Sequence, residues 1–335
     1  METLKNGTFI ISLDFELHWG VFDVKGIEQY KENLDNTRKA IKKIVSLSNK
    51  YGIRLTFSTV GFLFAKNKEQ LKLYMPKKLP SYTNQKFNPY LLFDIIGENE
   101  KEDPYHYAYN TIKQLAKDNR HEIGTHTFSH YYCQANGQTI NEFEADIISA
   151  KEIGESLNIP ITSIVFPRNQ VNDDYLKICS NYGITSYRGT EKAFIYSLKK
   201  GGKLQLVPLI IIKGLRLLDS YINIFGNKTY KISKIKNEKF DCVNLPSSSF
   251  LRPYNNKLKI FEYLKLQRIK KAMTYAAKNN ELYHLWWHPH NFGTNLDKNL
   301  EILENIFVHY NKLNATFNFC SDTMSTCRAK IKSEN

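Results

Sequence analysis

The chain of 335 residues is 42% hydrophobic and 13% aromatic, which is enough to bury a full-sized core and excludes wholesale disorder. The five cysteines are scattered and form no Cys-x-x-Cys pair, which favours free thiols in a reducing compartment. The sequence has no uncharged apolar run of about 18 residues and no secretory signal, so we expect a cytoplasmic protein without a membrane span. The net charge of +14 is concentrated in one segment, because residues 192–275 contain 18 Lys or Arg against 4 Asp or Glu, and the rest of the chain has 29 of each sign.

Apolar, β-branched stretches alternate with amphipathic stretches along most of the chain, as in proteins whose parallel strands are joined by helices. The expected strands are residues 8–13, 54–60, 122–125, 161–166, 184–188, 281–290 and 316–319. The expected helices are residues 33–51, 105–118, 139–157 with Asn141 as the cap, 173–182, 258–277 and 296–314, and the tail from Lys330 is expected to fray. The alternation predicts an α/β fold with a mostly parallel sheet.

Residues 192–256 interrupt this alternation and are interpreted as a basic insertion within a single domain, residues 1–335. Within the insertion, residues 204–225 have the pattern of an amphipathic helix or pair of helices, and a basic stretch follows. A solvated lysine face is one interpretation of this segment. Another is peripheral contact with an anionic membrane through residues 204–239. Nucleic acid is not an expected partner, because no recognition motif accompanies the charge.

Two acidic side chains follow the first expected strand. Asp14 and Glu16 are two residues apart, so along an extended chain they project to the same side. The carboxyl ends of strands are where ligand sites form in α/β barrels and open α/β sheets. Crowded carboxylates repel unless they share a cation, which favours a functional pair. The alternative is structural, with one acid capping a helix and the other paired with a lysine.

Two histidines follow the strand expected at residues 122–125. His126 and His130 are four residues apart, so on one face of a helical turn both imidazoles could bind a single metal ion. Two solvated loop histidines are the alternative. The acidic pair near the N-terminus and the histidines near the C-terminus favour a metal site.

Taken in order, these motifs resemble the polysaccharide deacetylase family, of the NodB-homology or carbohydrate esterase 4 type. After the acidic pair, His126 to His130 match the pattern H-[ST]-x-x-H, and Leu285 to His288 match a late L-x-x-H pattern. The resemblance covers residues 8–188 and 281–319. It implies a distorted (β/α) barrel that uses a divalent metal, usually zinc, to remove an N-linked acyl group from an amino sugar.

The resemblance also implies roles for individual residues. The family's first motif is T-F-D-D-G, with the first Asp as general base and the second as metal ligand. Here it reads Ser-Leu-Asp-Phe-Glu over residues 12–16, a D-x-E form similar to a variant subgroup. Asp14 is therefore the expected base and Glu16 the expected ligand beside His126 and His130, although the reverse assignment of the two acids stays open.

Further roles follow from the third and last motifs. Arg168, in Phe-Pro-Arg-Asn, is similar to the family's base-orienting arginine, and His288 is the implied general acid. Asn169, Trp287 and His290 are candidate substrate contacts. Of the two adjacent tryptophans in the last strand, alternation predicts one in the core and one available to a sugar ring.

We therefore expect a cytoplasmic, metal-dependent N-deacetylase acting on an amino sugar of a surface polysaccharide or lipid-linked glycan. Zn²⁺ suits two imidazoles and one carboxylate. One alternative is an N-deformylase of a lipid-linked or nucleotide-linked amino sugar. Another is a carbohydrate-binding pseudoenzyme, which Phe15 in place of the family's second Asp would favour. A membrane or nucleic-acid adaptor is the remaining class.

Overall fold

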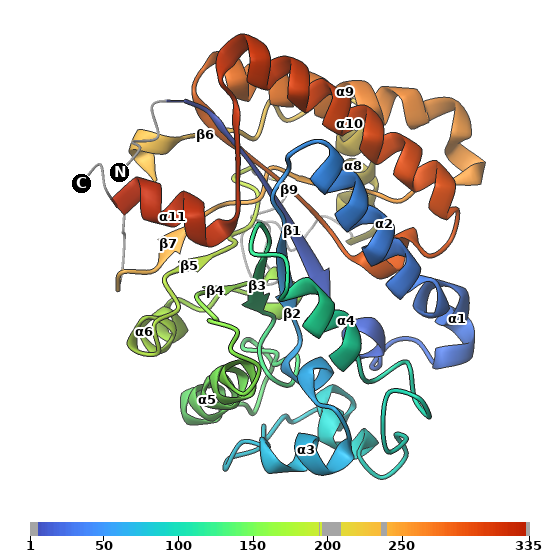
Figure 1. Cartoon of the computed structure of the whole chain (residues 1–335), viewed down its shortest axis with the longest axis vertical. Coiled ribbons are helices and arrows are strands. Elements are labelled where there is room, and N and C mark those ends of the chain that lie inside the picture. The colour runs from blue at the N-terminus through green and yellow to red at the C-terminus, as the bar shows by residue number, and fades with distance from the viewer. Residues whose placement is uncertain (1–5, 194, 196–208, 236–239, 333–335) are drawn as a thin grey trace.

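The computed structural model describes residues 6–193, 195, 209–235 and 240–332 (Figure 1). Its strands form one curled sheet in the order β6-β9-β1-β2-β3-β4-β5-β7, with β10 paired to β1 and β8 to β9. The strands are β1 (Thr8–Phe15), β2 (Thr56–Thr59), β3 (Glu122–Thr125), β4 (Ser163–Ile164), β5 (Ser186–Tyr187), β6 (Tyr230–Lys231), β7 (Val243–Asn244), β8 (Ser249–Phe250), β9 (Glu281–Trp287) and β10 (Cys320–Asp322). Within the described strands only β6 pairs antiparallel, so the expected α/β fold with a mostly parallel sheet is confirmed as a half-barrel.

The helices cover the outside of this sheet. They are α1 (Ile27–Asp35), α2 (Thr37–Lys50), α3 (Lys68–Leu73), α4 (Tyr109–Leu115), α5 (Ile140–Glu155), α6 (Asp173–Asn181), α8 (Leu209–Tyr221), α9 (Glu262–Lys278), α10 (Leu296–Phe317) and α11 (Met324–Lys332). Figure 1 shows α2, α9 and α10 beside β1 and β9, and α5 and α6 beside β3 to β5. Strand β1 is buried along its whole length, as its continuous apolar run predicts for a central parallel strand.

Several element boundaries differ from those expected. The helix expected at residues 33–51 is interrupted at Asn36, between α1 and α2. The N-cap of α5 is Thr139 rather than Asn141, because Thr139 and Glu142 form a reciprocal capping box. Helix α10 runs on to Phe317, so the last strand begins at Cys320. The expected fraying at Lys330 is wrong for residues 330–332, since α11 continues to Lys332, and residues 333–335 of the tail lie outside the described residues.

The insertion contributes to the same sheet. Strands β6 and β8 pair with β9, and β7 pairs with β5, so residues 230–250 extend both edges of the barrel. Helix α8 lies within the helix expected at residues 204–225; residues 204–208 of that range, and 236–239 of the basic stretch, lie outside the described residues. Among the helices that the structure describes, none has the length and apolarity needed to cross a bilayer.

Candidate metal centre

The two acids of the first motif meet at the carboxyl end of β1. Asp14 lies within the strand, Glu16 follows it directly, and both are almost completely buried, with exposed fractions of 2% and 4%. Phe15 between them is fully buried in the hydrophobic core. The i, i+2 spacing therefore places both carboxylates in the site, as the sequence indicates.

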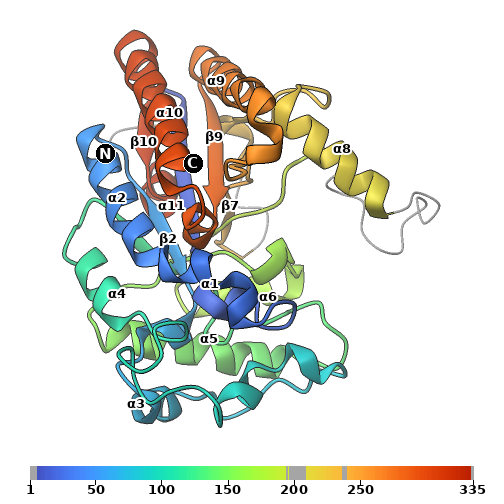
Figure 2. The same cartoon turned by 90° about the vertical axis from the view of Figure 1, so that its right-hand side faces the viewer.

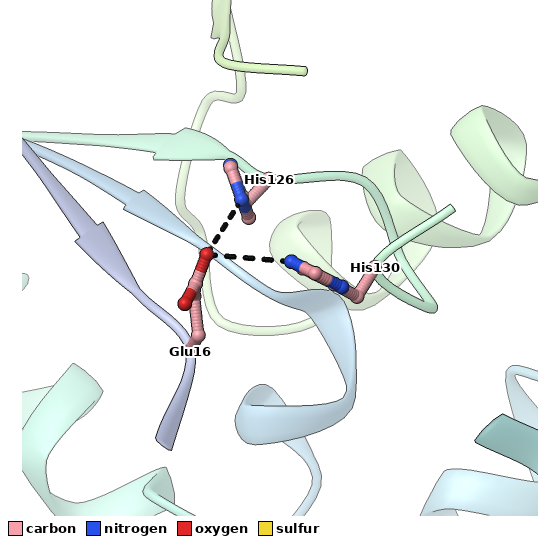
Figure 3. Close-up of side chains that lie close together, drawn as sticks. All are labelled: Glu16, His126 and His130. Carbon is pink, nitrogen blue, oxygen red and sulfur yellow. Dashed lines mark hydrogen bonds and ion pairs between the residues drawn. The ribbon is translucent and has the colours of Figure 1, made fainter. Parts of the chain in front are cut away.

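Glu16 is the point on which the two histidines converge (Figure 3). Its Oε1 lies 2.9 Å from Nε2 of His126 and 3.3 Å from Nε2 of His130. Burial opposes ionisation of Glu16, but the charge of His288 and contacts with His126 and His130 outweigh it, so the pKa of Glu16 lies well below its ordinary value. Glu16 is thus held as a carboxylate facing two imidazoles.

The histidines are brought together by a loop, and the expectation of a helical turn is wrong. His126 directly follows β3, and its backbone N–H donates to the carbonyl of Thr59 on β2. In the loop after it, Thr127 and His130 adopt left-handed backbone angles, with φ of 65° and 58°. Such angles are unfavourable for side chains with a Cβ and persist where the surroundings impose them.

Asp146, on α5, imposes this loop conformation. Its carboxylate accepts hydrogen bonds from the backbone N–H of Phe128 at 2.6 Å, from the backbone N–H of Ser129 at 3.0 Å and from the Ser129 hydroxyl. Burial raises the pKa of Asp146 to about 6 in spite of these donors. A buried acid on α5 thus fixes the conformation of the loop that carries both histidines.

The described residues fit a divalent cation. One potential ligand atom from each of Glu16, His126 and His130 lies within 4.8 Å of the other two. Nδ1 of His126 and Nδ1 of His130 are buried without a hydrogen bond, which is costly unless another group binds them, and Nε2 of His126 has its 2.9 Å contact with Glu16 but no hydrogen-bond geometry. Burial also lowers the pKa of His130, which favours the neutral imidazole that metals bind. Two imidazoles and one carboxylate form a donor set that zinc accepts.

Asp14 is held by an arginine that the sequence analysis did not select. Arg188 follows β5, is fully buried, and donates from Nη1 to Oδ1 and from Nη2 to Oδ2 of Asp14, both at 2.7 Å. The same guanidinium donates to the hydroxyl of Ser12 at 2.9 Å and to Oδ1 of Asn169 at 2.9 Å. Burial favours the neutral acid, but the charge of Arg188 prevails and lowers the pKa of Asp14.

Arg168, the arginine expected to orient Asp14, does not contact it. Its guanidinium pairs with Asp23 and lies 4.0 Å above the ring of Tyr132, and its backbone adopts φ 56°. Its neighbour Asn169 does reach the site, through Arg188. The signal for Arg188 was present in the sequence, because it is the last residue of an expected strand, while Asp14, His126 and Arg168 come just after the ends of others.

His288 faces the two acids from β9. Its Nε2 lies 3.7 Å from Oδ2 of Asp14 and 3.7 Å from Oε2 of Glu16. On the other side of the ring, the amide of Asn291 lies 3.3 Å from Nδ1, and Asn291 Oδ1 accepts from the hydroxyl of Tyr30 at 2.8 Å. A chain of hydrogen bonds from Tyr30 through Asn291 thus reaches Nδ1 of His288 and leaves Nε2 facing the two acids.

As alternation predicts, one tryptophan of β9 is buried in the core and the other is partly exposed. The expected substrate contact, Trp287, is the buried one. Trp287 is fully buried and stacks on Phe292, with 5.4 Å between ring centroids. Trp286 is partly exposed and lies under the guanidinium of Arg188, 4.1 Å from its ring centroid. His290 is buried against His288, their ring centroids 5.1 Å apart, and burial lowers the pKa of His290 to about 3.

A cavity of about 590 Å³ adjoins this centre. Trp286, Phe250 and Asn169 line it from the barrel, and Arg216 and Asp219 line it from α8. The rings of Trp286 and Phe250 also lie 5.7 and 5.9 Å from the ring of His288, between centroids. The cavity therefore lies between α8 and the aromatic rings that flank His288, and the three converging residues Glu16, His126 and His130 do not line it.

These features define an α/β half-barrel with a candidate metal centre at the carboxyl ends of its strands. Residues 34–187 match the family described as Polysaccharide deacetylase. The matched range contains His126 and His130, whereas the acids of β1, Arg188 and His288 lie outside it. The D-x-E subgroup stays a prediction.

Solved structures show the same fold at low sequence identity. A candidate polysaccharide deacetylase from Mycobacterium smegmatis is 10% identical with a TM-score of 0.60, over 100% of this chain and 93% of that one. One from Pseudomonas aeruginosa PAO1 is 10% identical with a TM-score of 0.54, over 98% and 91%. Puue allantoinase is 9% identical with a TM-score of 0.55, over 97% and 89%. No curated protein sequence matches the chain.

Proposed function

We propose that this chain is a metal-dependent hydrolase that removes an N-acyl group, in the first instance N-acetyl, from an amino sugar of a surface polysaccharide or lipid-linked glycan. The observation that carries the proposal is the convergence of Glu16, His126 and His130, with the buried pair Asp14–Arg188 on one side and His288 on the other. The match of residues 34–187 to the polysaccharide deacetylase family supports the same reaction class.

The three converging side chains would hold the cation, with Glu16 as the carboxylate ligand. Both oxygens of Asp14 already accept from Arg188, whereas Glu16 Oε1 faces two imidazoles, which supports this assignment over the reverse. When bound, a zinc ion would polarise the acyl carbonyl and acidify water at the site.

The remaining residues supply proton transfer. Asp14, kept ionised by Arg188, accepts a proton from the attacking water while the oxygen–carbon bond forms. His288, as the imidazolium, donates a proton from Nε2 to the sugar nitrogen as the carbon–nitrogen bond breaks, giving a free carboxylic acid, an amine and a neutral imidazole. Trp286 offers a partly exposed aromatic face to a sugar ring beside this centre.

A non-catalytic relative is the main rival, because Phe15 stands where the family's usual motif has its second Asp. The geometry weakens this rival, since Glu16 supplies a carboxylate one residue further on and Phe15 lies in the core. We also propose a cytoplasmic location; all five cysteines lie within the described residues and no disulfide joins them, which agrees with a reducing compartment.

The proposal is tested by measuring bound metal and released acid with the purified chain. The wild type should hold about one equivalent of zinc and release acetate from N-acetylated amino sugars. His126→Ala should lose both properties. His309→Ala, which alters a half-buried histidine on α10 bonded to Thr274, is the matched control and should keep both. Formate in place of acetate would identify a deformylase, and glycan binding without either acid would identify a pseudoenzyme.

A further inference from the structure

Large apolar side chains are exposed on the outer side of α8 and around the start of α9. Two of them, Ile210 and Ile260, have exposed fractions of 78% and 80%. The set, which we name the α8–α9 face, comprises Ile210, Ile211, Leu217, Leu218, Ile222, Ile224, Ile260, Phe261, Tyr263 and Leu264. Isolated exposed apolar residues are normal in soluble proteins, but a group of this size on two adjoining segments marks an interaction surface.

The two parts of the face are held together. The hydroxyl of Tyr221, at the end of α8, donates to Glu262 Oε1 at 3.4 Å, and Arg268 of α9 donates to the carbonyl of Gly226 at 3.0 Å. Along α8, Ile210, Leu217 and Leu218 fall on the outer side of the helix, spaced by seven and eight residues. Figure 2 shows α8 projecting from the body of the molecule next to α9.

The charges on this surface are all positive. Among the described exposed residues of 210–225 and 255–264, the charged side chains are Lys213, Lys257 and Lys259. The two acids of these segments point inward: Asp219 is buried and pairs with Lys228, and Glu262 is buried and pairs with Lys265. An exposed apolar surface with lysines at its edge and no exposed acid among its described residues is complementary to an anionic lipid surface.

We propose that the α8–α9 face docks on the surface of an anionic lipid bilayer. Acyl chains can enclose a projecting helix, and lipid phosphates would pair with the lysines at its edge. The other side of α8 carries Arg216 and Asp219, which line the cavity shared with Trp286. Docking therefore sets the cavity beside the bilayer, where an amino sugar carried on a lipid would be presented; this last step rests on the proposed function, whereas docking itself does not.

The experiment is co-sedimentation of the full chain with vesicles of phosphatidylcholine, with and without phosphatidylglycerol. We expect binding to the anionic vesicles only, weakened by salt. The triple variant Ile210→Ser, Leu218→Ser, Phe261→Ser should bind at least about tenfold more weakly. Leu73→Ser with Ile95→Ser is the matched control, since these residues are as exposed but belong to the region of α3, and it should bind as the wild type does.

Equal binding by wild type and triple variant, or no binding by either, would overturn the proposal. A concentration-dependent dimer that the triple variant abolishes, without vesicle binding, would assign the face to a second copy of the chain instead. Acid release from a soluble N-acyl sugar is measured in parallel and should be the same for all three proteins. A chain that binds vesicles but releases no acid would refute the proposed function and leave docking intact.

Discussion

The rim of the barrel and the α8–α9 face differ in where their charged side chains lie. At the rim, acids and bases are buried and closely opposed, as Asp14 is to Arg188 and Glu16 is to His126. On the α8–α9 face the acids are turned inward and lysines remain outside among apolar side chains. Buried charge is tolerated only with precise partners, so the rim agrees with the proposed chemistry, whereas the α8–α9 face agrees with the proposed docking.

The largest expected effect at the rim comes from Arg188. Arg188→Lys removes the two-pronged contact with Asp14, because an ammonium group cannot donate to both oxygens in the same geometry. We expect kcat to fall about a hundredfold with metal content unchanged. Arg168→Lys is the matched control and should change kcat several times less, since Arg168 pairs with Asp23. Equal losses from the two variants would refute the assignment of Arg188 to the base.

The next largest effect is expected from Gly20, whose missing side chain leaves space for Glu16. A Cβ at residue 20 would lie 1.8 Å from Oε2 and 2.8 Å from Cβ of Glu16, so the carboxylate must move. Gly20→Ala should weaken zinc affinity about tenfold or more, measured by competition with a chelator. Gly26→Ala, where a Cβ meets nothing within 4 Å, serves as control. Unchanged affinity in Gly20→Ala would argue that Glu16 is not a ligand.

Removing the support that Asp146 gives the histidine loop should lower zinc affinity by a similar or smaller factor. Asp146→Asn loses part of the acceptor capacity that holds the backbone of Phe128 and Ser129. We expect zinc affinity to fall about tenfold while the protein stays folded. The exposed Glu152→Gln on the same helix should leave affinity unchanged. If Asp146→Asn binds zinc like the wild type, the loop does not need this carboxylate.

The smallest effect on catalysis is expected from the two tryptophans of β9. One lines the cavity and the other is buried in the core. Trp286→Ala should raise KM about tenfold and leave the unfolding free energy nearly unchanged, because it lines the cavity. Trp287→Ala should lower the unfolding free energy by about 3–5 kcal/mol, because it is fully buried. Steady-state kinetics and urea unfolding distinguish the two; a reversal of the two outcomes would exchange their roles.

The sequence predicts best what depends on local periodicity. The run of residues 8–13 identifies β1, and the spacing of Asp14 and Glu16 places both carboxylates in the site. It does not predict which arginine reaches Asp14, because Arg168 and Arg188 both follow strands, and only the folded structure shows that Arg188 pairs with Asp14 and Arg168 with Asp23. It does not reveal the left-handed loop at His130 either, since that conformation depends on Asp146 from another element.

The central claim is that Glu16, His126 and His130 bind one cation, and X-ray absorption at the zinc edge of the zinc-loaded protein tests it most directly. We predict one zinc with two imidazole nitrogens and a carboxylate oxygen at about 2.0–2.2 Å, and loss of the imidazole signal in His126→Ala. A zinc spectrum without imidazole scattering, or one that His126→Ala leaves unchanged, would contradict the claim.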